Sequence, residues 1–530
     1  MYSTPELVAS TDASIDLARL TTLAWFGVEA DKTGKLVTSG SNAQGWTGWT
    51  GSAFAALKGR AQAGGVRVVL TIERFSWTTK QAHQTTALLS DPLRRTALAQ
   101  AITSAITGAG ADGVNLDFEP LPAAVRDDFT AFVRELRLDL DAAAPGMQLT
   151  FDVTSGIVAY DIPALVADDA ADAVMIMGYD YRGNSSAVTG SNDPLDDPSG
   201  PDLRESVDQM LALTSPDRVI LGLPWYGRAW SAVSTEPHAA TRSGSRVVSP
   251  ALPYYSGAIS LAQQHGRSYD PVDASAWTTY ELSACTGCKP AYRQLWYDDV
   301  DAFGAKVDLA VASGLRGIGI WALGYNGLQP ELWSALGLRL GDLVDSEAPT
   351  GTVTLDAASS HGRKDGLPLV GDLVHLALTS KDGASGSGVA FVRLSNGSEV
   401  GPDGALVGGQ DYPTVDGVDW SLRTGVPALP PLKQPRPTPT PSPDPSAVPT
   451  PTPVPSPSPD LTAGHRVINV QWRDVAGNWS TPVQVPVFYR PGITPTPTPT
   501  PTLAPSPSPS AAPTTSGAPA SGSPLPYAAP

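Results

Sequence analysis

From about residue 20 to residue 340, the chain alternates between short apolar runs and longer amphipathic stretches. Runs of the first kind are typical of buried strands, and the longer stretches show the spacing of helices. Strands that alternate with helices favour a parallel sheet, because each crossover connection needs about a dozen residues or more. Over about 300 residues, such a sheet is expected to close into a barrel with its helices outside.

Seven apolar runs have the length and composition of strands: Leu20–Val28, Val66–Ile72, Val114–Phe118, Leu149–Val153, Ala173–Met177, Val219–Leu223 and Gly317–Trp321. A complete (β/α)8 barrel has one strand more than this. The stretch 229–297 is too long for a single crossover, and it predicts a small inserted α+β subdomain. The sequence therefore predicts an α/β fold, a TIM barrel over residues 1–342 that carries this insertion.

After the barrel, the pattern changes to that of an antiparallel all-β module. Val374, Leu376 and Leu378 alternate with other residues, and a hairpin is predicted around Ala476–Asn478. Short strands of this kind are typical of a β-sandwich of the immunoglobulin or fibronectin type.

Two Pro-rich segments accompany this module. The sandwich is expected over 343–424 and 461–490, and the segment 425–460 interrupts it. A second segment, rich in Pro, Ser and Thr, forms the tail 491–530. Because neither segment has residues that could form a core, both are expected to be disordered.

The composition excludes two classes of partner. The chain has a net charge of −17 at pH 7, with 35 Lys and Arg against 52 Asp and Glu. This balance argues against binding to nucleic acid or to an anionic membrane surface. No apolar run approaches the roughly 18 residues that span a membrane. The first ten residues also lack the basic and apolar blocks of a signal peptide.

The only two cysteines of the chain, Cys285 and Cys288, lie in "SACTGCKPAY". They could form a redox pair, half of a zinc site or a local disulfide, or remain as two free thiols. Zinc needs four ligands, and the six histidines show no matching spacing. We favour a disulfide, which would close too short a loop to stabilise the fold much. No metal site is expected.

One predicted strand carries a row of polar groups. In "GADGVNLDFEP", residues 110–120, Asn115, Asp117 and Glu119 alternate with apolar residues. Side chains at such positions project from the same face of a strand. An unpaired carboxylate inside a barrel is costly, so this row indicates function. Glu119 would lie at the C-terminal rim, where barrel enzymes have their sites, and the charge of Asp117 would raise its pKa.

The motif "DGVNLDFE" resembles the D-G-x-D-x-D-x-E signature of glycoside hydrolase family 18, the chitinase-like hydrolases. Three further motifs resemble strands of this family in the same order: "MIMGYDY" at 175–181, "GLPWYGRAW" at 222–230 and "GIGIWALGY" at 317–325. In detail the motif is most similar to the branch of bacterial spore-cortex and spore-germination hydrolases. There, asparagine commonly replaces the second aspartate, as Asn115 does here.

The resemblance implies roles for particular residues. Glu119 would be the general acid and base, and Asp117 would orient the 2-acetamido group of the substrate. Tyr179 would donate a hydrogen bond to the acetamido carbonyl, with Asp180 beside it. Trp321 would form an apolar floor under the sugar. The implied mechanism is retaining and substrate-assisted, because the acetamido oxygen attacks the anomeric carbon; it is an exception to the two-carboxylate rule.

Three other residues have weaker assignments. Asn115 can hydrogen-bond Asp117 but cannot relay a proton, which predicts a changed pH profile. Tyr226 is expected at the rim of the site. Arg228 could lie at the rim, or equally serve as a structural ion-pair partner.

The resemblance also bears on the missing strand. In the family the acidic motif lies on strand four, but here it lies on the third predicted strand. We therefore expect that this chain lacks most of strand one and any export signal.

These inferences predict a glycosidase that cleaves β-1,4-linked N-acetylglucosamine polymers, either peptidoglycan or chitin. We expect it to act outside the cell or at the cell wall, as a monomer and without a cofactor. The alternative is a lectin-like protein on the same barrel that binds such polymers without cleaving them.

Overall fold

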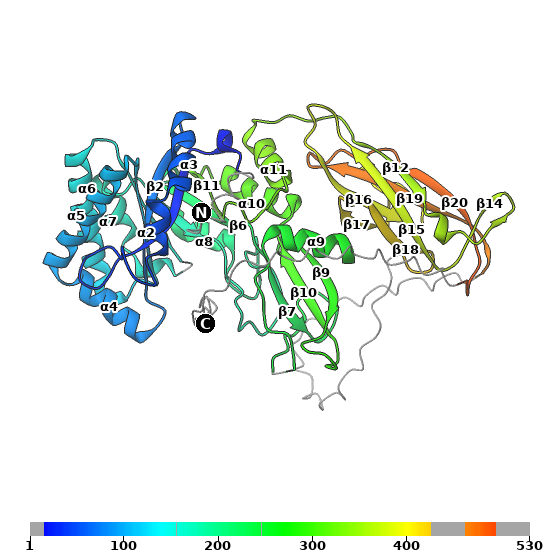
Figure 1. The fold of residues 1–530 in the computed structure, drawn as a ribbon, viewed down its shortest axis with the longest axis horizontal. Coiled ribbons are helices and arrows are strands. Elements are labelled where there is room, and N and C mark those ends of the chain that lie inside the picture. The colour runs from blue at the N-terminus through cyan, green and yellow to red at the C-terminus, as the bar shows by residue number, and fades with distance from the viewer. Residues whose placement is uncertain (1–14, 155, 245, 426–461, 494–530) are drawn as a thin grey trace, which may run out of the picture.

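The computed structural model describes residues 15–154, 156–244, 246–425 and 462–493 (Figure 1). The two Pro-rich segments fall almost entirely on 426–461 and 494–530, and the missing first strand was expected at or before Met1. These predictions lie outside the described residues.

A parallel seven-stranded sheet forms the first half of the molecule. Its order is β1-β2-β3-β4-β5-β6-β11, and every neighbouring pair is parallel. The strands are β1 (Thr22–Glu29), β2 (Arg67–Phe75), β3 (Gly113–Glu119), β4 (Gln148–Val153), β5 (Ala173–Met177), β6 (Val219–Pro224) and β11 (Gly317–Trp321). Each predicted strand is present, and the curled sheet with its helices confirms the predicted barrel-type fold.

Helices connect these strands and cover the outer face of the sheet (Figure 1). They are α2 (Gln44–Trp49), α3 (Ser52–Ala63), α4 (Thr79–Leu89), α5 (Pro92–Ala109), α6 (Arg126–Ala143), α7 (Ile162–Val166), α8 (Leu203–Leu211), α10 (Val300–Ala312) and α11 (Glu331–Leu340). Helix α6 buries Phe129, Phe132 and Leu136 against the sheet. No helix within the described ranges combines the length and the apolar character needed to cross a membrane.

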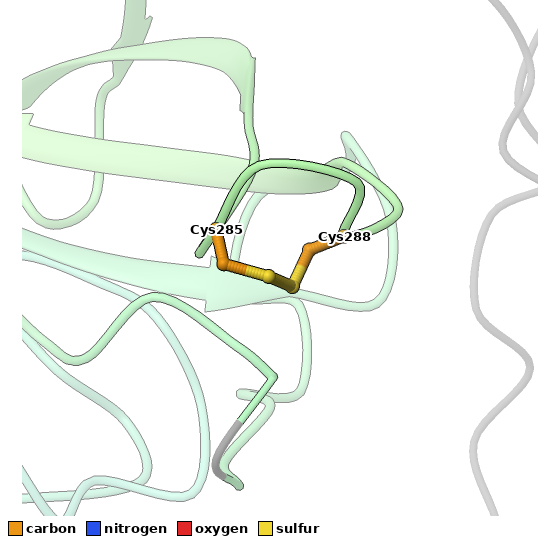
Figure 2. The surroundings of a disulfide bond; sticks show 2 residues. All are labelled: Cys285 and Cys288. Carbon is orange, nitrogen blue, oxygen red and sulfur yellow. A yellow bond between two sulfur atoms is a disulfide. The ribbon is translucent and has the colours of Figure 1, made fainter.

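A small antiparallel sheet is present where the inserted subdomain was predicted. Its order is β7-β10-β9-β8, with β7 (Arg228–Ala232), β8 (Ser268–Asp270), β9 (Ser275–Leu282) and β10 (Ala291–Tyr297), and helix α9 (Tyr255–His265) packs beside it. Cys285 and Cys288 form a disulfide in the turn between β9 and β10, with Cα atoms 5.1 Å apart (Figure 2).

The C-terminal module consists of two sheets around a core of its own. One sheet contains β12 (Thr350–Leu355), β15 (Leu373–Lys381) and β18 (Gly417–Ser421). The other contains β13 (Arg363–Lys364), β14 (Leu367–Val370), β16 (Val389–Ser395), β17 (Gln410–Pro413), β19 (Gly464–Asp474) and β20 (Val483–Tyr489). Strands β19 and β20 form the predicted antiparallel hairpin. Trp420 and Trp472 are buried in this core.

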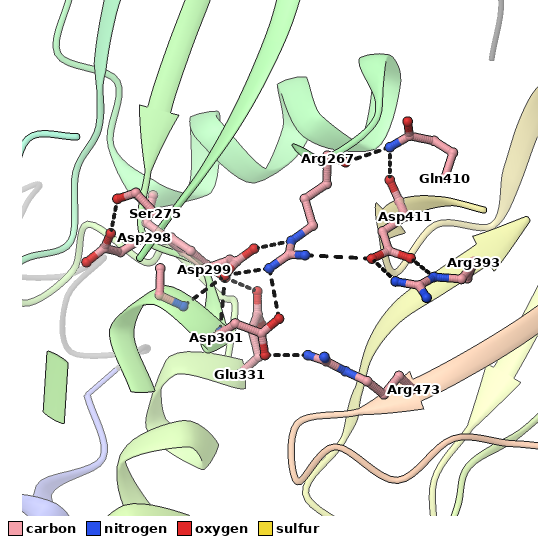
Figure 3. A network of polar contacts seen from close by, with 12 residues as sticks. Arg267, Ser275, Asp298, Asp299, Asp301, Glu331, Arg393, Gln410, Asp411 and Arg473 are labelled. Atoms are coloured by element: carbon pink, nitrogen blue, oxygen red, sulfur yellow. Dashed lines mark hydrogen bonds and ion pairs between the residues drawn. The ribbon is translucent and has the colours of Figure 1, made fainter. Parts of the chain in front are cut away.

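We call the parallel sheet with its helices and the inserted subdomain the barrel half. It is joined to the C-terminal module through a buried cluster of charged residues, which we call the interface network (Figure 3). Arg267, just before β8, forms ion pairs with Asp299 at 2.6 Å and Asp301 at 2.8 Å, both near the start of α10. Its guanidinium also lies 3.6 Å from Asp411 of β17. Arg473 of β19 pairs with Asp301 at 2.5 Å. The two halves are therefore linked by ion pairs that cross their boundary.

Two cation–π contacts reinforce this boundary. The guanidinium of Arg267 lies over the ring of Phe391, 4.5 Å from its centroid, and that of Arg473 lies 4.7 Å from the same centroid. The ring of Phe391 is itself 2% exposed and belongs to the core cluster of the barrel half. The C-terminal module thus contributes a side chain to the core of the other half.

Candidate active site

Strand β3 holds the predicted polar row inside the curled sheet. Val114, Leu116 and Phe118 face the helices, and the ring of Phe118 packs 5.4 Å from that of Phe129. The alternate side chains of Asn115, Asp117 and Glu119 face the other way and are 8%, 3% and 6% exposed. The pleat of one strand therefore brings these three groups together on its inner face.

Residues outside the site hold this strand in register. The hydroxyl of Tyr160 donates a hydrogen bond of 2.8 Å to the carbonyl of Phe118. Asp112 accepts hydrogen bonds from the backbone N–H of Val68 at 2.7 Å and from the amide of Gln62 at 2.9 Å. The first aspartate of the motif therefore fastens β3 to β2 and α3, and it does not face the polar row.

Asn115 is held by neighbours on β4. Its amide donates a hydrogen bond of 2.7 Å to Asp152, and Thr150 donates one of 2.7 Å to its carbonyl oxygen. Sequence reasoning missed Asp152, although an aspartate within the apolar run "LTFDV" was a signal of the same kind as Asp117. Burial raises the pKa of Asp152 to about 7, against the lowering effect of the Asn115 hydrogen bond.

Asp117 and Glu119 both bind protons more tightly than ordinary carboxyls. Burial raises the pKa of Glu119 to about 8, and the charges of Asp152, Asp180 and Glu73 add to this effect. Burial, followed by the charge of Glu119, raises the pKa of Asp117 well above its usual range. The predicted direction for Glu119 is correct, but burial rather than the charge of Asp117 is its main cause.

A further carboxyl, Glu73 on β2, was also missed. In the register of the sheet, Glu73 lies opposite Asp117, and Phe75 lies opposite Glu119. Burial and the charge of Glu29 raise the pKa of Glu73 to about 7. The sequence signal for Glu73 was an acidic residue within the apolar run "VVLTIERF", but this run was predicted only as a strand without site residues.

Aromatic side chains form another part of the site. The rings of Tyr179, just after β5, and Trp321, the last residue of β11, are stacked with centroids 6.5 Å apart. Phe26 of β1 contacts Trp321 edge-on at 4.5 Å. Because β1 and β11 are the two edges of the sheet, this contact brings them together beside the polar row. Trp321 is partly exposed, so its ring can meet a ligand.

Asp180 is fixed in place by the two residues whose role was open. The hydroxyl of Tyr226 donates a hydrogen bond of 2.7 Å to Asp180, and Arg228 forms an ion pair with the same oxygen at 2.6 Å. Asp180 has φ of 61°, a left-handed conformation that costs energy in a residue with a side chain. Asn192 accepts a hydrogen bond from its N–H at 3.1 Å. Arg228, 4% exposed, is thus an ion-pair partner within the site.

Comparison with known proteins decides the family. The family model described as glycosyl hydrolases family 18 matches residues 8–326. The chain belongs to glycosyl hydrolase family 18. This membership confirms the resemblance that the four motifs indicated, and it identifies the barrel half as a glycosyl hydrolase domain.

Curated relatives of this family 18 chain include bacterial and animal enzymes. The cortical fragment-lytic enzyme of Bacillus subtilis is 25% identical over 258 residues, which cover 47% of this chain and 54% of that protein. Di-N-acetylchitobiase of Mus musculus is 25% identical over 260 residues, which cover 43% of this chain and 68% of that protein. The chain spans about half to two thirds of the length of the curated relatives it matches.

Solved structures of the same fold include an agglutinin and two enzymes. The chitinase-like agglutinin of Robinia pseudoacacia has a TM-score of 0.53 at 20% identity, over 64% of this chain and 98% of that one. Group IV chitinase of Ostrinia furnacalis, in complex with allosamidin, has a TM-score of 0.53 at 19% identity, over 63% of this chain and 92% of that one. The spore cortex-lytic enzyme SleL of Bacillus cereus has a TM-score of 0.50 at 19% identity, over 63% of this chain and 72% of that one. At such identities the likeness shows the fold alone.

Proposed function

We propose that this chain is a retaining glycoside hydrolase that cleaves β-1,4-linked N-acetylglucosamine polymers by substrate-assisted catalysis. The observation that carries the proposal is the pair Asp117 and Glu119. Both are buried on one face of β3 with raised pKa values, at the strand end beside Tyr179 and Trp321. Raised pKa values of this kind concentrate at catalytic sites.

In this mechanism Glu119 first acts as the general acid. With a pKa of about 8, its carboxyl carries a proton at neutral pH and can transfer it to the glycosidic oxygen as the bond to the leaving sugar breaks. The acetamido carbonyl oxygen of the substrate attacks the anomeric carbon from the opposite side and forms a cyclic cation. Glu119, now ionised, then takes a proton from the water that opens this ring, and the original configuration is retained.

The other residues orient and stabilise the substrate. Asp117 accepts a hydrogen bond from the acetamido N–H and offsets the positive charge that develops on this group. Tyr179 donates a hydrogen bond to the acetamido oxygen, and Trp321 provides a flat apolar surface under the sugar. Asp180, held by Tyr226 and Arg228, lies beside the ring of Tyr179. The requirement for an acetamido group restricts the cleaved position to N-acetylated sugars.

The substrate class follows from this requirement and from the relatives. The relatives include a cortical fragment-lytic enzyme, a spore cortex-lytic enzyme and a di-N-acetylchitobiase, so we propose peptidoglycan or chitin as the polymer. Both are found outside the cell membrane, and we propose that the chain acts there, as a monomer. The net charge of −17 does not favour an anionic partner.

A lectin-like activity is the second candidate, because an agglutinin shares the fold. The two candidates differ in what they require of Glu119. A lectin needs a groove but no general acid, whereas a hydrolase needs a carboxyl that is protonated before the reaction. Both carboxyls of the motif are present here, which favours the hydrolase.

Sugar release from chromogenic N-acetylglucosamine oligomers and from purified peptidoglycan tests this proposal. Glu119→Gln keeps the shape of the side chain but removes its exchangeable proton, so turnover should fall to background while oligomer binding persists. The matched control is Glu399→Gln, an exposed glutamate of the C-terminal module, which should retain full activity. Oligomer binding by the unaltered chain with no release from either substrate would favour the lectin.

A further inference from the structure

Glu73 lies among the proposed catalytic groups. Along β2, Val68, Leu70 and Ile72 belong to the core under the helices, so Thr71 and Glu73 lie on the inner face with the polar row. Adjacent strands lie about 4.8 Å apart, and Glu73 is in register with Asp117. Their side chains are therefore neighbours across the two strands.

The space that Glu73 occupies depends on a glycine of β1. A Cβ atom added at Gly27 would lie 2.8 Å from the Oε2 atom of Glu73, which is closer than two such atoms can approach. The preceding residue of β1, Phe26, contacts Trp321. The absence of a side chain at position 27 thus leaves room for this carboxyl beside the sugar floor.

No basic side chain neutralises Glu73 within the described part of the chain. Its neighbour Arg74 points to the other face, where it binds Glu29, Gln84 and Thr85. Among the described residues, the carboxyl of Glu73 has no hydrogen-bond or ion-pair partner.

The titratable groups around Glu73 are almost all acidic. Glu29 on β1 and the acids Asp117 and Glu119 on β3 interact with Glu73 through their charges, and the cation of Arg74 is engaged by Glu29. Asp152 on β4 and Asp180 after β5 act in turn on Glu119. Carboxyls this close cannot all be ionised, so a proton must be shared among them.

Asn115 cannot take part in this sharing. Its amide is bound to Asp152 and its carbonyl oxygen to Thr150, and a carboxamide does not ionise at these pH values. One oxygen of Asp117 is buried with no hydrogen-bond partner among the described residues. The protonation of Asp117 therefore depends on the charges around it, and Glu73 is in register with it across β2 and β3.

We propose that Glu73 is a positioning residue: its carboxylate, in register with Asp117 on the inner face of the sheet, acts through its charge to keep protons on Asp117 and Glu119 in the free site. The carboxyl of Glu73 lies toward Gly27 of β1 and forms no hydrogen bond with Asp117, so no proton passes directly between the two. Loss of this charge makes both acids easier to ionise. This role rests on the proposed function.

The first test compares Glu73→Gln with the unaltered chain over a range of pH. The loss of a nearby negative charge lowers the pKa values of both Asp117 and Glu119. Both limbs of the kcat/KM profile should therefore shift to lower pH, and kcat should fall by about tenfold to a hundredfold. Glu73→Asp, which keeps a carboxyl, should restore part of both properties. A purely structural role would lower stability and leave both limbs in place.

The second test does not require turnover. The carboxyl carbon of Asp117 is titrated by ¹³C NMR in the unaltered chain and in Glu73→Gln. Its midpoint should shift to lower pH in the variant, and a midpoint that does not change would overturn the proposal. If the unaltered chain does not hydrolyse either substrate, the proposed function is refuted instead. Failure of the proposed role of Glu73 can therefore be distinguished from failure of the proposed function. Thermal unfolding of each variant shows that it has folded.

Discussion

The carboxylates of the active site and those of the interface network are buried to a similar degree, but their surroundings differ. Asp117 and Glu119 are 3% and 6% exposed, and Asp299 and Asp411 are 1% and 9% exposed. At the interface, guanidinium groups lie against the acids: although burial opposes it, Arg473 and Arg267 hold the pKa of Asp301 below its usual range, whereas burial raises the pKa of Asp299 against the lowering effect of Arg267. In the candidate active site no described arginine forms an ion pair with Asp117 or Glu119, and the pKa values of both acids rise.

A cation beside a buried carboxyl, or its absence, decides whether that carboxyl is part of a stabilising ion pair or keeps a proton that it can donate. A buried pair with good geometry stabilises a specific arrangement, and it is damaged mainly when one partner is removed. A buried carboxyl without a cation is costly to ionise, so it holds its proton at neutral pH and can donate it. The candidate active site and the interface network thus contain the same type of side chain in opposite surroundings.

The largest expected effect comes from breaking the paired cluster. Arg267→Met leaves Asp299 and Asp411 without their central cation, and removal of one partner of a buried pair costs about 3–5 kcal/mol. The free energy of unfolding, measured with urea, should fall by this amount, whereas kcat per folded molecule should not change. A variant that loses activity but no stability would contradict the structural role of this cluster.

The converse result is expected in the active site. Asp117→Asn removes a buried carboxyl that lacks a cation, so stability should not fall. Activity on N-acetylglucosamine oligomers should fall by about 10²- to 10³-fold, because the positive charge on the acetamido group loses its partner. Urea unfolding and initial rates measured on the same preparations check both halves. A large loss of stability would mean that Asp117 is a structural residue.

The pH dependence of stability sharpens the comparison. Glu119 has a folded pKa of about 8, above its ordinary value of 4.5, so the folded state binds more protons than the unfolded state between these values. Its contribution to stability is therefore full below pH 4.5 and is lost as the pH rises to 8. Relative to the unaltered chain, Glu119→Gln should gain up to about 1.4 kcal/mol per pH unit across this window. Urea titrations at pH 5 and pH 8 test this prediction. If the free energy of unfolding of the variant differs from that of the unaltered chain by the same amount at both pH values, the prediction is wrong.

A smaller effect is expected at the wall of the site. Tyr179→Phe keeps the ring against Trp321 but removes one hydrogen bond to the acetamido oxygen. A single hydrogen bond contributes about 0.5–1.5 kcal/mol, so kcat/KM should fall by about twofold to tenfold. Tyr181→Phe is the matched control, because the hydroxyl of Tyr181 binds Ser206 instead. Similar losses in the two variants would argue against a role for Tyr179 with substrate.

The smallest effect is expected at the disulfide. The double variant Cys285→Ser and Cys288→Ser opens a loop of only a few residues, and short loops add little entropy to the unfolded chain. The melting temperature should change by only a few degrees, and activity should not change. A reduction in activity would show that the turn between β9 and β10 contributes to the substrate groove.

The sequence predicted what depends on local pattern. The strands were found because each is a separate apolar run, and Asn115, Asp117 and Glu119 were grouped because a pleat repeats every two residues. Glu73 and Asp152 were missed because they join the row only through the register of β2 and β4 with β3. The same holds for Arg267 and Asp411, which come together only when separate domains pack. The functional roles of the site residues stay predictions.

The interface network has a consequence for anyone who shortens this chain. The barrel ends in the sequence near residue 342, but in space its core includes Phe391, and Asp301 of α10 depends on Arg473. A fragment that stops after α11 would expose the surface under that ring and leave Asp301 with one guanidinium instead of two. Inactivity of such a fragment would therefore reveal nothing about whether the C-terminal module binds substrate.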